Sequence, residues 1–114
     1  MTPVLTVKFY ALASGHEPVR DWLREQDFEI RKVVGEDIKT VQMGWPIGMP
    51  LVRKLESGLW EVRSHIPDGI VRVLFTTQGA KMLLLHGFVK KSDKAPKSDI
   101  ALARRRKKDI DHEE

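Results

Sequence analysis

Four side chains in the second half of the chain have the chemistry needed to handle a phosphodiester. They are two arginines, a histidine and a lysine: Arg63, Arg72, His86 and Lys90. An arginine presents a planar fork of N–H donors that matches the non-bridging oxygens of a phosphate, and a lysine adds a compact positive charge. A histidine exchanges protons near neutral pH. Each of the four lies in a run of β-favouring apolar residues, so we expect strands to carry them.

Strand periodicity predicts that these four side chains share one face of a sheet. Successive side chains on a strand point to opposite faces. In residues 81–90, His86 and Lys90 share their face with three further residues: Met82, Leu84 and Phe88. When the apolar faces of neighbouring strands stack, Arg63 and Arg72 emerge on that same side. The next cations along the chain, Lys91 and Lys94, follow where the strand ends.

Such a face suits the cleavage of RNA without a metal ion. RNA carries its own nucleophile, the 2′-hydroxyl. A protein must then supply a base for the hydroxyl proton, cations for the charged phosphorane and an acid for the leaving 5′-oxygen. Glu61, His86 and the lysines can divide the proton transfers, and Phe88 can stack on a base. The four histidines are scattered along the chain and no metal-ligand spacing is present, so we expect neither a metal nor a cofactor.

Structural roles for the same residues stay open. Arg63 and Arg72 can pair with Glu61 across neighbouring strands, or can lie on a solvated sheet face. His86 precedes a glycine in an apolar strand, where a hydrogen-bonded structural histidine is common. The basic run at residues 104–108, which includes Arg104 and Arg105, is equally typical of a solvated helix face.

The elements that position this face follow from the periodicity of the sequence. Residues 5–12 alternate as a strand. A helix is predicted near Pro18, whose missing N–H would be unpaired in a first turn anyway, and a second helix after Asp27 as N-cap. Residues 51–66 form one strand, interrupted at 57–58, and tight turns at 67–69 and 78–79 join it to strands 70–77 and 81–90. Ser98 is expected to cap a final helix at residues 99–110. The predicted class is α+β, with two N-terminal helices packed on a mainly antiparallel four-stranded sheet and a C-terminal helix.

Positive charge is concentrated in the last third of the chain. Residues 81–108 contain ten Lys or Arg and two acidic residues, whereas residues 1–80 contain ten of each kind. Residues 109–114 contain four acidic residues and no basic one. The basic segment 90–108 therefore favours a polyanionic partner, and we expect the acidic end 109–114 to shield part of it.

Length and composition fit one globular domain spanning residues 1–114. The chain has 114 residues, of which 41% are hydrophobic and 32% are charged. It has no cysteine, which excludes disulfides and agrees with a reducing cytoplasm. The N-terminus lacks the pattern of a signal peptide, and no stretch reaches the roughly 18 apolar residues of a membrane span. We therefore expect a cytoplasmic protein with no membrane partner.

Three motifs in the second half of the chain carry a family resemblance. They are KLESGLWEVR at Lys54–Arg63, IVRVLF at Ile70–Phe75 and HGFVKKSDKAP at His86–Pro96. Together they resemble the RelE/ParE superfamily of bacterial toxins, and within it the HigB-like, phage-derived branch. The resemblance implies a RelE-like domain and a toxin of a type II toxin–antitoxin system. It also implies ribosome-dependent, metal-free cleavage of mRNA by attack of the 2′-hydroxyl on the adjacent phosphate, which inhibits translation.

The resemblance also implies roles for individual residues by their place in these motifs. The predicted catalytic residues are Arg63, Arg72, His86, Lys90 and Lys91. The predicted RNA-binding residues are Lys54, Phe88, Lys94, Arg104 and Arg105. Several relatives use a tyrosine near the C-terminus, whereas the sole tyrosine of this chain is Tyr10.

The resemblance implies three partners. They are a helix-turn-helix, HigA-like antitoxin, the ribosome with mRNA in its A site, and operator DNA reached only through the antitoxin. Two other functions stay open. ParE relatives share the fold and inhibit DNA gyrase without cutting RNA, and a phage homologue can be inactive and only bind its antitoxin.

Overall fold

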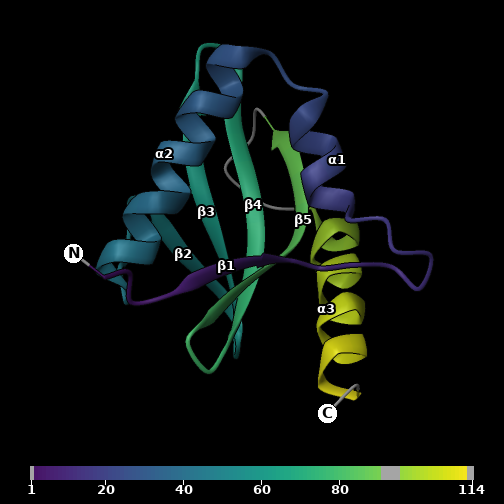
Figure 1. The fold of residues 1–114 in the computed structure, drawn as a ribbon. Coiled ribbons are helices and arrows are strands. Elements are labelled where there is room, and N and C mark those ends of the chain that lie inside the picture. Colours follow the sequence, from purple (N-terminus) through teal and green to yellow (C-terminus); the bar gives the residue numbers. More distant parts are fainter. Residues whose placement is uncertain (1, 91–95, 113–114) are drawn as a thin grey trace.

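The computed structural model of the chain describes residues 2–90 and 96–112, which form three helices and five strands (Figure 1). In chain order the elements are β1 (Thr6–Phe9), α1 (Pro18–Arg24), α2 (Phe28–Gly44), β2 (Val52–Glu56), β3 (Leu59–Ile66), β4 (Gly69–Gln78), β5 (Lys81–Lys90) and α3 (Lys97–His112). The predicted α+β class is confirmed. The predicted number of strands is wrong, because the sheet has five strands and is mixed.

The extra strand comes from residues 51–66, which the sequence pattern predicts as one interrupted strand. The structure instead folds them into a hairpin, in which β2 and β3 pair antiparallel with Glu56 opposite Leu59. Ser57 and Gly58 form the turn, and Gly58 has a φ of +75°. Glycine adopts such a φ without steric cost, so the chain reverses at this position and does not continue as an extended strand.

The sheet has the strand order β1-β5-β4-β3-β2. The hairpins β3–β4 and β4–β5 are antiparallel, as the predicted meander requires, and the unpredicted hairpin β2–β3 is antiparallel too. β1 pairs with β5 in parallel, over Thr6–Phe9 only. It is therefore shorter than the predicted strand at residues 5–12, and it leaves the second half of β5 without a partner from β1.

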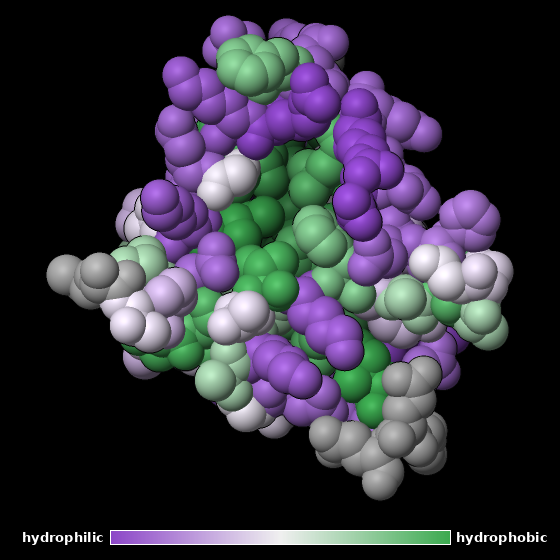
Figure 2. Space-filling model, in the orientation of Figure 1, coloured by the Kyte–Doolittle hydropathy of each residue, from purple (hydrophilic) through white to green (hydrophobic). Residues whose placement is uncertain are grey.

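The helices divide between the two faces of the sheet (Figure 1). α1 and α2 cover one face and build the larger core, whose buried residues are Leu5, Val19, Val34, Ile38, Val41, Val52, Val62, Val71, Val73, Phe75, Met82 and Leu84. α3 packs on the other face over a smaller core of Tyr10, Leu59, Leu74, Leu85 and Ala103. Figure 2 shows hydrophobic surface in a hollow between α2 and α1, with hydrophilic residues along both rims.

A β-bulge in β5 separates the strand into two halves with different partners. The register between β4 and β5 shifts after the pair Leu74 and His86, because the next pair is Phe75 with Leu84. Leu85 is therefore the extra residue, and an extra residue reverses the alternation of faces. Met82 and Leu84 consequently face α1 and α2, while His86 and the residues after it at even positions face α3. The prediction that all of them share one face is wrong for this reason.

The helix boundaries agree with the sequence signals except at α3. Pro18 starts α1, and Asp27 occupies the N-cap position of α2, although its side chain makes no capping hydrogen bond. α3 begins at Lys97, so Ser98 lies inside the helix and does not cap it. Within residues 2–90 and 96–112, none of the helices combines the length and apolar composition needed to cross a bilayer.

Candidate functional site

Three cross-strand rows place the predicted catalytic side chains on the face that α3 covers. In the middle row Arg63 lies opposite Arg72, and Arg72 lies opposite Phe88. The row toward the bulge joins Glu61, Leu74 and His86, and the row toward the strand ends joins His65, Ile70 and Lys90. Diagonal neighbours in such rows are roughly 7–8 Å apart, so His86 and Lys90 flank Arg72 on either side.

The centre of this face is a buried ion pair. The guanidinium Nη1 of Arg72 donates a hydrogen bond to Oε1 of Glu61 at 2.7 Å, and both side chains are 0% exposed. Nε of Arg63 lies 3.7 Å from the same carboxylate oxygen, and Arg63 is 9% exposed. Two guanidinium groups and one carboxylate leave a net positive charge beneath the surface. The pairing of Arg72 with Glu61, which the sequence left as an alternative, is therefore present. It gives Arg72 a structural role, whatever its part in chemistry.

Opposing effects act on the Glu61 carboxyl group. Burial raises the pKa of Glu61 above its ordinary value, and the charges of Arg72, Arg63 and Arg53 act in the opposite direction. Oε2 of Glu61 accepts no hydrogen bond from any residue that the structure describes. Loss of hydration on burial disfavours the charged form of the carboxyl group, which is the physical cause of the raised pKa.

His86 lies beside this ion pair and is held from several sides. Its Nε2 is 2.6 Å from Oδ1 of Asp99, which belongs to the first turn of α3. Its ring stacks on Phe88, with centroids 5.4 Å apart and an interplanar angle of 28°. His86 also lines a cavity of about 200 Å³ whose other walls include Trp22 and Leu102.

The structure does not bring Lys54 to this face. Lys54 pairs with Trp60, which packs against the core beneath α1 and α2, so Lys54 belongs to the opposite face of the sheet. Its neighbour Arg53 lies opposite Glu61 and therefore belongs to the face that carries Glu61, Arg63 and Arg72, which we call the cationic face. His65, which was not among the predicted site residues, is exposed in the same row as Lys90. The alternation of side chains along β2 and β3 is the sequence signal that could have identified Arg53 and His65.

The basic residues of α3 divide between its outer surface and its contacts with the sheet. Arg104 and Arg105 are both exposed, and Arg104 also makes two hydrogen bonds to the carboxylate of Glu56, at 2.7 and 3.0 Å. These bonds and the charge of Arg104 lower the pKa of Glu56. Arg106 donates to the carbonyl oxygen of Leu85 at 2.7 Å. Two predicted site residues, Lys91 and Lys94, lie outside the described residues.

The site can bind an anion and transfer a proton. Arg53, Arg63, Arg72 and Lys90 supply positive charge on one face, and His86 supplies a proton-exchanging group between that charge and the small cavity. No group of three or more potential metal ligands occurs among residues 2–90 and 96–112.

Comparison with known proteins identifies a family for most of the chain. Residues 21–108 match the model of a phage-derived protein family described as Gp49-like (DUF891). This span includes every residue of the cationic face and all of α3 up to Lys108. No curated protein matches the chain significantly.

Proposed function

The chain belongs to the Gp49-like family, a RelE/HigB-type toxin family of type II toxin–antitoxin systems, and on that premise we propose that it is a ribosome-dependent mRNA endonuclease. One observation supports the proposal above the others. Arg63, Arg72, His86 and Lys90 occupy adjacent positions on one sheet face, so a proton-transfer group lies next to concentrated positive charge. That combination is what cleavage of RNA at its own 2′-hydroxyl requires.

In the proposed reaction, the 2′-oxygen of the RNA attacks the adjacent phosphorus atom. A bond forms between the 2′-oxygen and phosphorus, and the bond between phosphorus and the 5′-oxygen breaks. The proton of the 2′-hydroxyl passes to His86, and the leaving 5′-oxygen takes a proton from Lys90. The products are a 2′,3′-cyclic phosphate and a 5′-hydroxyl, and no metal ion takes part.

The arginines stabilise the charge that develops on the phosphorane. Arg72 is fully buried, so in this conformation it acts on a bound phosphate through its charge and by holding Glu61, without a direct hydrogen bond. A buried charge acts strongly at a distance because the surrounding protein screens it less than water does. Arg53 and Lys90 are both partly exposed and supply the groups that meet the phosphate directly.

The basic outer surface of α3 supplies a second contact with RNA. Lys97, Arg104, Arg105 and Lys108 are all exposed and lie on one helix. Neutralising phosphates with such residues releases counterions, so we expect affinity for the ribosome to fall steeply with salt. The proposed partners are the ribosome with mRNA in its A site and a HigA-like helix-turn-helix antitoxin that also carries the complex to operator DNA.

The proposal is tested by expressing the full chain without an antitoxin and mapping mRNA 5′ ends by primer extension. We expect discrete cuts in translated messages, and about 10²-fold weaker cutting by Lys90→Ala because a group that acts in the transition state is lost. The matched control is Lys39→Ala, the same substitution at an exposed position of α2, which we expect to cut normally.

Three results would overturn this function. Intact mRNA together with double-strand DNA breaks would indicate a gyrase inhibitor, and normal growth would indicate a chain that only binds its antitoxin. On purified ribosomes, cleavage should continue in EDTA at concentrations that leave the ribosomes intact. Loss of cleavage under those conditions would exclude the metal-free reaction.

A further inference from the structure

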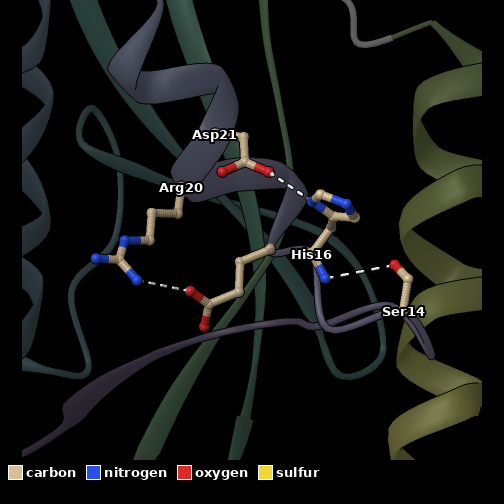
Figure 3. Close-up of polar contacts among 5 residues, drawn as sticks. Ser14, His16, Arg20 and Asp21 are labelled. Carbon is tan, nitrogen blue, oxygen red and sulfur yellow. Dashed lines mark hydrogen bonds and ion pairs between the residues drawn. The ribbon is translucent and has the colours of Figure 1, made fainter.

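Two histidine–aspartate pairs occur in the described part of the chain, and they differ sharply. The His86–Asp99 pair has a contact of 2.6 Å, and its side chains are only 17% and 21% exposed. The His16–Asp21 pair lies between the loop before α1 and α1 itself (Figure 3). Its contact is 3.7 Å, and its side chains are 74% and 50% exposed. Only the first pair has the distance of a strong, charge-assisted hydrogen bond.

The contact with Asp99 determines which nitrogen of His86 can act as a base. An ionised carboxylate only accepts hydrogen bonds, so the ring nitrogen that faces it carries the proton when the ring is neutral. Here that nitrogen is Nε2. The lone pair is then left on Nδ1, and the opposite tautomer would have no proton to share with Asp99. A carboxylate that fixes the tautomer of a neighbouring histidine is a general way of orienting a base.

The surroundings of His86 restrict its ring and leave its side chain only 17% exposed. Phe88 stacks on the ring at 5.4 Å, and the cavity next to it is lined mainly by apolar side chains, among them Val19, Trp22 and Leu102. Trp22 comes so close to β5 that only glycine fits at position 87, where an added Cβ would lie 2.8 Å from two ring carbons. A hydrogen bond in such a place is stronger than one in water.

Anchoring of α3 does not depend on Asp99 alone. Glu56 binds Arg104, the carbonyl oxygen of Leu85 accepts a hydrogen bond from Arg106, and the hydroxyl group of Tyr10 donates to Asp109 at 2.8 Å. Arg106 also lies over the Tyr10 ring, 5.5 Å from its centroid. These contacts hold the middle and the end of the helix, so a change at Asp99 leaves the rest of α3 fixed to the sheet.

We propose that Asp99 is a positioning residue that holds His86 in the tautomer with the proton on Nε2, so that Nδ1 accepts the proton of the RNA 2′-hydroxyl. The inference rests on the proposed endonuclease function and extends it by naming the accepting nitrogen and the residue that selects it. Asp99 touches neither the RNA nor the reacting atoms, and it acts only through the imidazole.

The test measures the tautomer and the cleavage rate in the same set of full-length variants. Ring nitrogen chemical shifts of ¹⁵N-histidine-labelled protein, recorded at about pH 8 where most imidazoles are neutral, report which nitrogen carries the proton. We expect Nε2–H for His86 in the wild type. In Asp99→Asn the amide can donate to the ring, so we expect an increase in the Nδ1–H form. Single-turnover cleavage on programmed ribosomes should fall about 10²-fold or more in that variant.

Two further variants separate positioning from anchoring. Asp21→Asn makes the same change in the exposed pair and should leave the His86 tautomer and the cleavage rate unchanged. Glu56→Gln weakens a different α3 contact and should also preserve the tautomer. Equal losses of cleavage in Glu56→Gln and Asp99→Asn, with the tautomer unchanged in both, would show that Asp99 only anchors the helix.

The outcomes distinguish this inference from the function on which it rests. Full cleavage by Asp99→Asn beside an active wild type would refute the inference and leave the endonuclease standing. An Nδ1–H tautomer in the wild type would refute it in the same way, whatever the cleavage rates. Absence of cleavage by the wild type would refute the endonuclease itself, and with it the proton transfer assigned to Nδ1.

Discussion

Replacement of Arg72 by methionine probes the buried ion pair most directly. Methionine keeps an unbranched side chain of similar length but removes the guanidinium group, which donates to Glu61 at 2.7 Å. The Glu61 carboxylate then stays buried, and Nε of Arg63 lies at the longer distance of 3.7 Å from it. Leaving a buried charge without its closest partner is strongly destabilising, whereas removing both partners together is often neutral.

The expected loss is about 3 kcal/mol in the free energy of unfolding at pH 7. Breaking a buried pair costs roughly 3–5 kcal/mol, and the lower end applies here because Arg63 still attracts the carboxylate and because the carboxyl group can take up a proton. A domain of this size has a stability of roughly 5–15 kcal/mol. The substitution therefore removes a fifth or more of the total, and the thermal midpoint should fall by about 10–15 °C.

The assay is urea unfolding followed by tryptophan fluorescence, with the slope of each transition checked against the wild type. The matched control is Arg104→Met, because Arg104 also lies 2.7 Å from a glutamate but is 49% exposed. We expect little change in that control, since exposed pairs are screened by water and salt. The double variant Glu61→Gln with Arg72→Met should recover most of the loss. Equal effects of Arg72→Met and Arg104→Met would refute the assignment of the cost to burial.

Three further predictions concern the same face of the sheet and its support. Since burial raises the folded-state pKa of Glu61 above its unfolded value, the folded chain gains stability from Glu61 as pH falls through that pKa. This gain in stability is complete below about pH 4.5, the ordinary pKa of a glutamate side chain. The deficit of Arg72→Met should therefore shrink between pH 7 and pH 4.5 in urea titrations, and a widening deficit would contradict the raised pKa. Glu61→Gln should cost about 3 kcal/mol at pH 7, because it leaves the buried Arg72 guanidinium without the carboxylate that it binds at 2.7 Å. A nearly neutral Glu61→Gln would contradict the assignment of this cost to the buried pair. Gly87→Ala should cost about 1–3 kcal/mol by overpacking, since its Cβ would lie 2.8 Å from the Trp22 ring. Trp22→Leu should relieve that extra cost in a double-variant cycle, and additive losses would exclude the clash.

The sequence alone predicts the order of the elements apart from the β2–β3 hairpin, and the shared face of Arg63 and Arg72, and the structure shows why it fails elsewhere. Alternation within β3 and β4 placed Arg63 and Arg72 together because both strands are regular in that region. It failed in β5 because the bulge at Leu85 arises from pairing with β4, which no pattern within β5 reveals. The hairpin turn at Gly58 was visible as a break, but only the pairing of Glu56 with Leu59 makes it a reversal.

Contacts between distant segments were the least predictable part of the site. Asp99 lies 13 residues from His86, and nothing in the spacing of the two residues predicts that α3 folds back to bring them together. The sequence identifies Tyr10 only as the sole tyrosine, yet its hydroxyl group donates to Asp109, 99 positions further along the chain. The motif position points to Lys54, but the strand pairing places its neighbour Arg53 opposite Glu61.

The bulge at Leu85 makes the length of β5 a determinant of the site in its own right. Residues before it pack beneath α1 and α2, and residues after it face α3, so a single added residue connects the two halves of the strand in opposite orientations. Deleting one residue here would keep every side chain of the motif and yet turn His86, Phe88 and Lys90 toward the wrong helices. A sequence alignment that places a gap at this position would therefore match the residues of the motif but not the face on which they lie. A design that removes the bulge would likewise keep the motif residues and lose their arrangement on one face of the sheet.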